Sequence, residues 1–367
     1  MILHFWRAAR VGCFSLLLGA AAVRGANENP DRVSVLSVAG DAQAAKAAIG
    51  ADGSIHLLMD SARGPRYLKS SDAGRTFSSP IEVVDAASLK PGLIFAISDL
   101  AVGRNGLVHV AMSNNAWKLK LPQEEWGFYY AVLAPGAKAF SPVRNLNRKP
   151  SEGFSLAANE AGSVSAWFLS GKLYRMNSHD DGGSFSAYTE ANPAWSPCEC
   201  CTTAAAYGAD GRLAVLYRER TDNERNIFVV VADAGASPRL ARRRVSATNW
   251  KVDACPMTYF SIQPAGGGYV AAWPTKGQVY FARLDPEGRV LPPGEIRTPG
   301  TSGMRTGVLA LAAADGCTLV SWKNGNVLGW QLYDAQNQPI GSPGSTNSLG
   351  GGAAGVTLRD GRFVLFR

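Results

Sequence analysis

The stretch ADGSIHLLM, residues 51–59, joins a tight Asp-Gly turn to a strand in which apolar residues predominate. Asp-Gly pairs readily adopt the positive φ values that two-residue hairpin turns require. The unit, a turn ending in glycine followed by an apolar strand, occurs seven times. The strands after the turns read SIHLLM, LVHVAM, SVSAWF, RLAVLY, YVAAWP, CTLVSW and RFVLFR. Successive turn glycines lie 45 to 57 residues apart, at Gly53, Gly106, Gly162, Gly211, Gly268, Gly316 and Gly361.

A period near fifty residues, with no long helical periodicity, is typical of a β-propeller blade built from four strands. We therefore predict an all-β propeller of six to seven four-stranded blades, and the seven turns favour seven. The last unit stops after two strands at the end of the chain. The apolar segment RVSVLSV, residues 32–38, is predicted to complete that blade and close the ring, which removes free sheet edges.

A second motif follows the apolar strands and fits S-x-D-x-G-x-x-F. Its two full copies consist of Ser70, Asp72, Gly74 and Phe77, and of Ser178, Asp180, Gly182 and Phe185. Degenerate copies with spacing near fifty contain Asp233, Asp285 and Asp334. We expect each carboxylate to accept backbone N–H bonds in the turn between the third and fourth strands, because Asp side chains commonly bond their own turn. The motif residues are therefore assigned to stability.

The motif resembles the Asp-box of sialidases and other BNR-repeat proteins. This resemblance implies a propeller whose Asp-box turns lie on the outer rim, away from the channel mouth. It also implies the alternative of an exo-α-sialidase-type glycoside hydrolase, in which three arginines clamp a carboxylate and a Glu activates a Tyr nucleophile.

The arginines of such a site are not found where the resemblance places them. The first inner strand reads AAKAAIG, residues 44–50, and contains no arginine. Arg305 is the clearest arginine entering an inner strand, and Tyr259 and Glu219 are weak candidates for the remaining roles. Without a full set of arginines a carboxylate loses bidentate hydrogen bonds. The sequence favours a binding module, for a glycan, a protein partner or a soft metal at a channel mouth that carries cysteines, over an enzyme.

Four cysteines are predicted to converge at one channel mouth. Cys198, Cys200 and Cys201 precede the inner strand of the fourth unit, and Cys255 precedes that of the fifth. Four cysteines allow three pairings. We expect Cys255 to bond one of the first three, which would link adjacent blades.

The alternative for this cluster is a soft-metal site with thiolate ligands, for which copper(I) is suited. Met257 and His179 are further candidate ligands. Cys317 lies within an apolar strand and is expected to be an inert thiol.

A cluster of aromatic residues accompanies an insertion in the second unit. It comprises Trp117, Trp126, Phe128, Tyr129 and Tyr130. Aromatic rings stack on sugar faces, yet in a propeller most of them pack between blades. Glycan stacking and core packing therefore both stay open for these residues.

Residues 1–25 resemble a secretory signal peptide, with a basic start, an apolar run at 11–23 and small residues before Ala26. A retained N-terminal anchor is the alternative. We expect residues 26–367 to form one domain that is periplasmic or secreted and not integral to the membrane. The formal charge of +8 falls to +5 when Arg7, Arg10 and Arg24 are removed. Since the basic residues are scattered, apart from the run at 242–244, nucleic-acid binding is not predicted.

Overall fold

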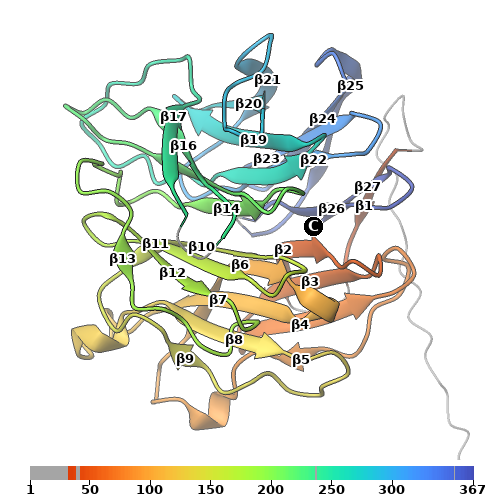
Figure 1. Ribbon diagram of the computed structural model, residues 1–367. Helices are drawn as coiled ribbons and strands as arrows, with labels where there is room; N and C mark the ends of the chain where they lie inside the picture. Colours follow the sequence, from red (N-terminus) through yellow and green to blue (C-terminus); the bar gives the residue numbers. More distant parts are fainter. Residues whose placement is uncertain (1–31, 39–41, 236–237, 351) are drawn as a thin grey trace, which may run out of the picture.

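Seven small sheets are arranged in a ring in the computed structural model, which describes residues 32–38, 42–235, 238–350 and 352–367 (Figure 1). The elements are, in chain order, β1 (Val33–Leu36), β2 (Gln43–Ile49), β3 (Ile55–Ser61), β4 (Gly64–Ser70), β5 (Ile81–Glu82), η1 (Ala86–Ser88), β6 (Phe95–Val102), η2 (Arg104–Gly106), β7 (Val108–Asn114), η3 (Gln123–Glu125), β8 (Tyr129–Leu133), β9 (Arg144–Asn145), β10 (Glu152–Ala158), β11 (Val164–Leu169), β12 (Leu173–Ser178), β13 (Thr189–Glu190), β14 (Ala204–Tyr207), β15 (Leu213–Arg218), β16 (Ile227–Ala232), β17 (Leu240–Arg244), β18 (Ser261–Ala265), β19 (Gly268–Thr275), β20 (Gln278–Leu284), β21 (Ile296–Thr301), β22 (Val308–Ala312), β23 (Thr318–Asn324), β24 (Val327–Tyr333), β25 (Pro339–Asn347), β26 (Ala354–Thr357) and β27 (Phe363–Phe366). The η elements are single turns of 3-10 helix.

Each sheet is one blade of a seven-bladed propeller. Six sheets contain four consecutive antiparallel strands, from β2-β3-β4-β5 to β22-β23-β24-β25. The first strands of the blades, β2, β6, β10, β14, β18, β22 and β26, each contact the first strands of both neighbouring blades. This closed circle confirms the predicted propeller and shows that it has seven blades rather than six.

The seventh blade contains three strands, in the order β1-β27-β26. β1 pairs in parallel with β27, from Val33 opposite Phe363 to Leu36 opposite Phe366. The two ends of the described chain therefore share one sheet, which confirms the predicted closure by the N-terminal strand. This blade departs from the four-stranded pattern because the C-terminal unit supplies only two strands.

The core lies between blades, in seven apolar clusters that are each shared by two neighbouring sheets. Between the fourth and fifth blades, for example, Leu216 and Val229 pack in one cluster with Tyr269 and Trp273. The second strand of a blade is covered on both faces, and every residue of β11 is buried. This double coverage explains why the strands after the glycine turns are almost wholly apolar.

The glycine turns adopt the predicted backbone conformation. Gly53 has a φ of 83°, and in the fifth turn Gly267 rather than Gly268 has the positive value, 85°. Other residues rarely adopt such angles, so glycine at these positions allows the chain to reverse between the first and second strands.

The first full Asp-box forms the turn between β4 and β5. The Ser70 hydroxyl donates to Asp72 Oδ1 at 2.8 Å and accepts the Gly74 N–H at 2.9 Å. Asp72 Oδ1 also accepts the Thr76 N–H at 2.9 Å. Phe77 packs edge-on against Phe366 of the seventh blade, with ring centroids 6.0 Å apart.

The second full copy, between β12 and β13, repeats these bonds. Ser178 donates to Asp180 at 2.6 Å, and Asp180 accepts the Ser184 N–H at 2.9 Å. Phe185 packs edge-on against Tyr130 of the preceding blade. In both copies the carboxylate therefore holds the turn while the aromatic side chain contacts the neighbouring blade.

Two degenerate copies keep the carboxylate bond to the backbone four residues ahead. Asp285 accepts the Arg289 N–H at 2.7 Å, and Asp334 accepts the Gln338 N–H at 2.8 Å. Asp233, in the third degenerate copy, instead lies 3.7 Å from Arg212.

Candidate functional site

A cavity of about 910 Å³ opens at the end of the ring where the inner strands begin. All seven blades contribute to its wall, either through the start of an inner strand or through the loop before it. Lys46 from β2, Glu152 from β10 and Val308 from β22 are examples. Because these loops converge on the ring axis, side chains that are far apart in sequence face one space.

Aromatic side chains form part of the cavity wall. Trp117 is 58% exposed, Trp126 is half-buried, and both belong to the insertion between β7 and β8. Trp126 Nε1 donates to the Leu121 carbonyl at 3.0 Å, which fixes its ring within the insertion. By contrast, Phe128 and Tyr130 are fully buried and pack between blades. The aromatic cluster therefore divides between the core and the cavity.

Charged groups of both signs face the same cavity. Burial raises the pKa of Asp60, and burial together with nearby Glu199 raises the pKa of Glu152. Lys46 Nζ forms an ion pair with the Asp99 carboxylate at 3.1 Å. Arg305, in the loop before β22, also lines the cavity and is exposed.

The structure brings together two of the three weak catalytic candidates. Arg305 and Tyr259 both line the cavity. Glu219 does not; it is buried and accepts hydrogen bonds from the Tyr217 hydroxyl at 2.7 Å and from Arg242 at 3.0 Å. Among the described residues that line the cavity, Arg305 is the single arginine. A clamp of three arginines is therefore not assembled there.

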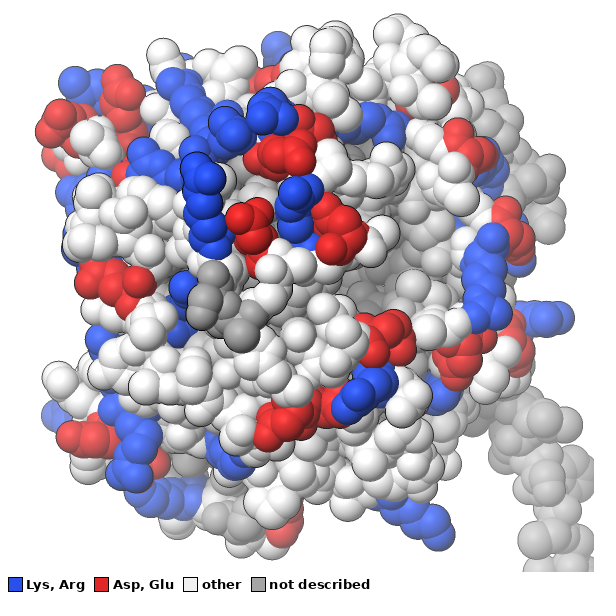
Figure 2. Space-filling model, viewed as in Figure 1, with Lys and Arg blue, Asp and Glu red and all other residues white. Residues whose placement is uncertain are grey.

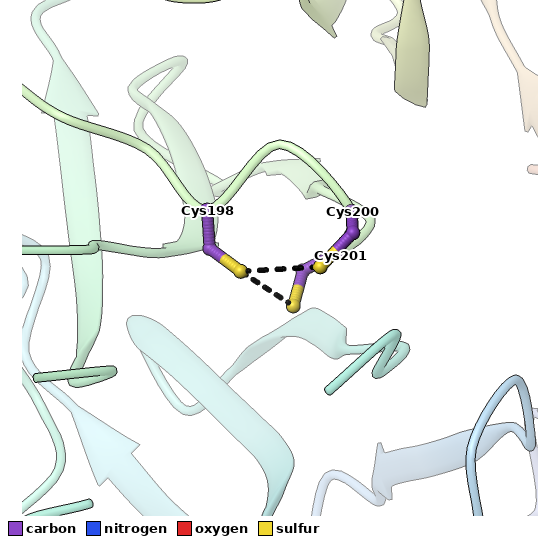
Figure 3. A group of neighbouring side chains, drawn as sticks. All are labelled: Cys198, Cys200 and Cys201. Atoms are coloured by element: carbon purple, nitrogen blue, oxygen red, sulfur yellow. Dashed lines mark hydrogen bonds between the residues drawn. The ribbon is translucent and has the colours of Figure 1, made fainter. Parts of the chain in front are cut away.

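A disulfide joins Cys200 to Cys255, with Cα atoms 6.1 Å apart, and so confirms the predicted bridge between the two segments. Cys198 and Cys201 are buried free thiols. The Cys198 sulfur lies 3.3 Å from that of Cys201 and 3.5 Å from that of Cys200 (Figure 3). Figure 3 shows the three side chains directed toward one another from the loop before β14. Cys201 also lines the cavity.

The other predicted metal ligands lie apart from this cluster. Met257 lines the cavity, where its sulfur accepts a hydrogen bond from Arg305 Nε at 3.2 Å. His179 is exposed on the Asp-box turn after β12. Among the described residues, the potential metal ligands whose ligand atoms all lie within 4.8 Å of one another are Cys198, Cys200 and Cys201. Cys317 is a buried thiol elsewhere, 3.3 Å from Arg32.

Two buried arginines accompany the free thiols, and the sequence pattern indicated neither. Arg225 Nη1 donates to the Cys198 sulfur at 2.9 Å. Arg218 donates to the Thr258 hydroxyl at 3.3 Å, and that hydroxyl lies 3.4 Å from the Cys201 sulfur. Burial alone raises the pKa of Cys201, but the hydrogen bond with Cys198 and the charge of Arg218 outweigh it, so the net effect is a lowered pKa. Nothing in the pattern Tyr-Arg-Glu-Arg at 217–220 shows which arginine turns inward.

The basic run at 242–244 lies in the outer strand β17, and its side chains make hydrogen bonds and an ion pair within the protein. Arg242 pairs with Glu219, Arg243 donates to the Glu287 carbonyl, and Arg244 donates to the Ser246 carbonyl. Acidic and basic side chains are interspersed on the face shown in Figure 2. In the described part of the chain, no helix has the length and apolar character needed to span a membrane.

Neither a known protein family nor a curated protein sequence matches this chain. Solved structures do match. A polysaccharide lyase of family PL25, an ulvan lyase, is similar with a TM-score of 0.52 at 10% identity, covering 88% of both chains. The fucose-recognising six-bladed lectin of Aleuria aurantia is similar with a TM-score of 0.51 at 13% identity, covering 85% of this chain and 98% of the lectin. A sialidase from Streptococcus pneumoniae reaches a TM-score of 0.44 at 12% identity, covering 94% of this chain and 66% of the sialidase. At these identities the similarity establishes the propeller fold alone.

Proposed function

We propose that this protein is a sialidase-like Asp-box propeller that binds a glycan in the cavity at its channel mouth. The observation that carries the proposal is the composition of the cavity wall. An exposed Trp117 and a half-buried Trp126 offer ring faces, and Asp60, Glu152 and Arg305 offer hydrogen-bonding groups in the same space. Sugars present apolar faces and ordered hydroxyl groups, which this combination suits.

The volume of the cavity supports a ligand of oligosaccharide size. A space of about 910 Å³ lies in the upper part of the range for small-molecule sites. A polysaccharide lyase and a lectin that recognises fucose share the propeller fold. These neighbours support glycan binding as a use of this architecture.

Membership of the Asp-box family and export from the cytoplasm belong to the same proposal. The turn geometry around Asp72 and Asp180 supports the first. The Cys200–Cys255 disulfide supports export, because disulfides persist mainly in oxidising compartments. The proposed signal peptide, residues 1–25, lies outside the residues that the structure describes.

Binding of the purified chain to an array of neutral and uronate-containing oligosaccharides tests the proposal, followed by calorimetry on the strongest binder. Trp117→Ala should weaken that binding roughly two- to twelvefold, which corresponds to the loss of about 0.5–1.5 kcal/mol of stacking. Tyr188→Ala is the matched control, because Tyr188 is an exposed aromatic that does not line the cavity.

Equal losses in both variants, or an array without a bound oligosaccharide, would contradict the proposal. The hydrolase alternative is separated by incubation with a fluorogenic sialoside. Since the cavity presents one arginine among its described lining residues, we expect no release of the fluorophore. Release would instead establish an enzyme with an unfamiliar carboxylate clamp.

A further inference from the structure

Two buried guanidinium groups next to the free thiols have no acidic partner among the residues that the structure describes. Arg218 is 1% exposed and Arg225 is 5% exposed. Within the described chain, no carboxylate oxygen lies within 4 Å of either one. The Nε atoms of both side chains also have no hydrogen-bond partner there. Burying a charge is costly unless it is paired, so this site calls for negative charge.

The groups that surround the two guanidiniums limit where that charge can reside. Arg218 donates to the carbonyls of Arg225 and Pro274, and stacks near the rings of Trp250 and Phe260. None of these groups can carry a negative charge. Arg225, in contrast, donates directly to the Cys198 sulfur. The sulfurs of Cys198 and Cys201 are the nearby atoms that can become anionic.

We propose that Cys198 and Cys201 form a binding site for a soft monovalent cation, Cu(I), held between two thiolates and stabilised by Arg218 and Arg225. The two sulfurs are 3.3 Å apart, come from one loop and are almost wholly buried. A small separation of the two ligands allows them to take opposite sides of one ion after a modest side-chain rotation. Thiolate sulfur is the ligand type that selects Cu(I).

Charge decides between Cu(I) and the commoner thiolate-bound metal, Zn(II). Two thiolates and one Cu(I) carry a net charge of −1, which the guanidiniums stabilise, and the thiol protons leave to solvent. Two thiolates and one Zn(II) are neutral and leave both guanidiniums uncompensated. Zn(II) also requires four ligands in structural sites, and the third cysteine of the group, Cys200, is already in a disulfide. The same argument disfavours a neutral Cys198–Cys201 disulfide.

The cation has a route to the site. Cys201 and Cys200 line the channel-mouth cavity, whereas Cys198 lies behind them and is 0% exposed. Of the two proposed ligands, Cys201 is therefore the residue that borders the space that an ion can enter. Nothing in this route requires the glycan proposed above, so the two proposals succeed or fail separately.

The test is a titration of the purified protein with Cu(I), in competition with a chromogenic Cu(I) chelator. The free thiols are kept reduced and the Cys200–Cys255 disulfide is kept intact. We expect one Cu(I) bound per chain. Cys198→Ser and Cys201→Ser should each weaken binding at least tenfold. Cys317→Ser is the matched control and should leave binding unchanged. Cys317 is also a buried thiol beside an arginine, but the described residues place no second cysteine sulfur in contact with it.

A second measurement needs no substitution and covers variants that fail to fold. In unsubstituted protein, one equivalent of Cu(I) should protect Cys198 and Cys201 from alkylation after brief denaturant exposure, as mapped by peptide mass, and Zn(II) should not. Equal alkylation with and without Cu(I), or equal protection by Zn(II), would overturn the proposal. So would a Cys198–Cys201 disulfide in protein isolated without reductant, since it would show that neutral sulfur suffices beside the two guanidiniums.

Discussion

Replacement of Asp72 by alanine tests whether the Asp-box turn stabilises the ring. The carboxylate accepts three hydrogen bonds, from the Thr76 N–H at 2.9 Å, the Thr76 hydroxyl at 2.6 Å and the Ser70 hydroxyl at 2.8 Å. It also sets the position of the turn from which Phe77 packs against Phe366 of the closing blade. The substitution removes all three bonds but removes no apolar side chain from the core between the blades.

The expected loss follows from these contacts. A hydrogen bond contributes about 0.5–1.5 kcal/mol net, so three of them give a gross value of about 2–4 kcal/mol. Asp72 is partly exposed, and solvent both screens its charge and can replace it as an acceptor for Thr76. We therefore expect Asp72→Ala to lower the free energy of unfolding by about 1–3 kcal/mol.

The pH dependence of this loss is a stricter test than its size. Hydrogen bonds from Thr76, foremost its hydroxyl, lower the pKa of Asp72 to about 2. A lowered pKa means that the ionised carboxylate stabilises the folded state above the unfolded pKa near 4, and that this stability is lost as the pH falls toward 2. The difference between the two proteins should therefore narrow between about pH 4 and pH 2.

Urea unfolding followed in parallel by fluorescence and circular dichroism measures both quantities, provided that the two transitions coincide. Thr76→Val serves as a companion variant, because it removes the hydroxyl donor and keeps the backbone N–H. It should lose part of the stability that Asp72→Ala loses. An Asp72→Ala protein with an unchanged midpoint at pH 7, or a difference that does not depend on pH, would refute the assigned role.

Two further predictions concern the channel mouth, and a third concerns the closing blade. Serine at both Cys200 and Cys255 should lower the free energy of unfolding by up to about 4 kcal/mol in the chain-entropy model, since the bridge closes a separation of 55 residues; an unchanged urea midpoint would argue against this. Asp60→Asn should raise the melting temperature at pH 7 but not at pH 3, because burial raises the pKa of Asp60 and the ionised form therefore destabilises the fold as pH rises through that pKa. Asp315→Asn should instead lower the melting temperature at pH 7, since a hydrogen bond from Arg32 lowers the pKa of Asp315 and its ionised form therefore stabilises the fold. Melting temperatures that shift equally in Asp60→Asn and Asp315→Asn would contradict the argument.

The fold could be predicted because each repeat contains two local features, a glycine turn and a predominantly apolar strand. The predominantly apolar segment 54–59, which follows the turn at Asp52-Gly53, corresponds closely to β3, which spans Ile55–Ser61. Closure by residues 32–38 was predictable because a two-stranded last unit leaves an edge to cover. The parallel direction of β1 was not predicted, since no local pattern distinguishes a parallel partner from an antiparallel one in so short a strand.

The candidate site was predictable only in part. Cys200 and Cys255 occupy the same place in adjacent repeats, so the repeat itself indicated that they meet. Arg218 could not be found in this way, because it ends β15, a strand buried on both faces. In such a strand the alternation that assigns side chains to core or solvent carries no information. Glu219, which follows β15, bonds Tyr217 and Arg242 and does not line the cavity.

The position of the Cys200–Cys255 disulfide indicates what it stabilises. The ring is already held by contacts between the inner strands and by an apolar cluster at each of the seven blade interfaces. The disulfide joins two loops ahead of β14 and β18 rather than the strands themselves. Residues 199–203 of one loop and residues 257, 259 and 260 of the other contribute to the cavity wall. Fixing a binding loop before the ligand arrives reduces the entropy that binding must overcome. Besides its effect on stability, the bridge fixes two loops of the cavity wall, so its removal should weaken the proposed glycan binding even where the ring stays folded.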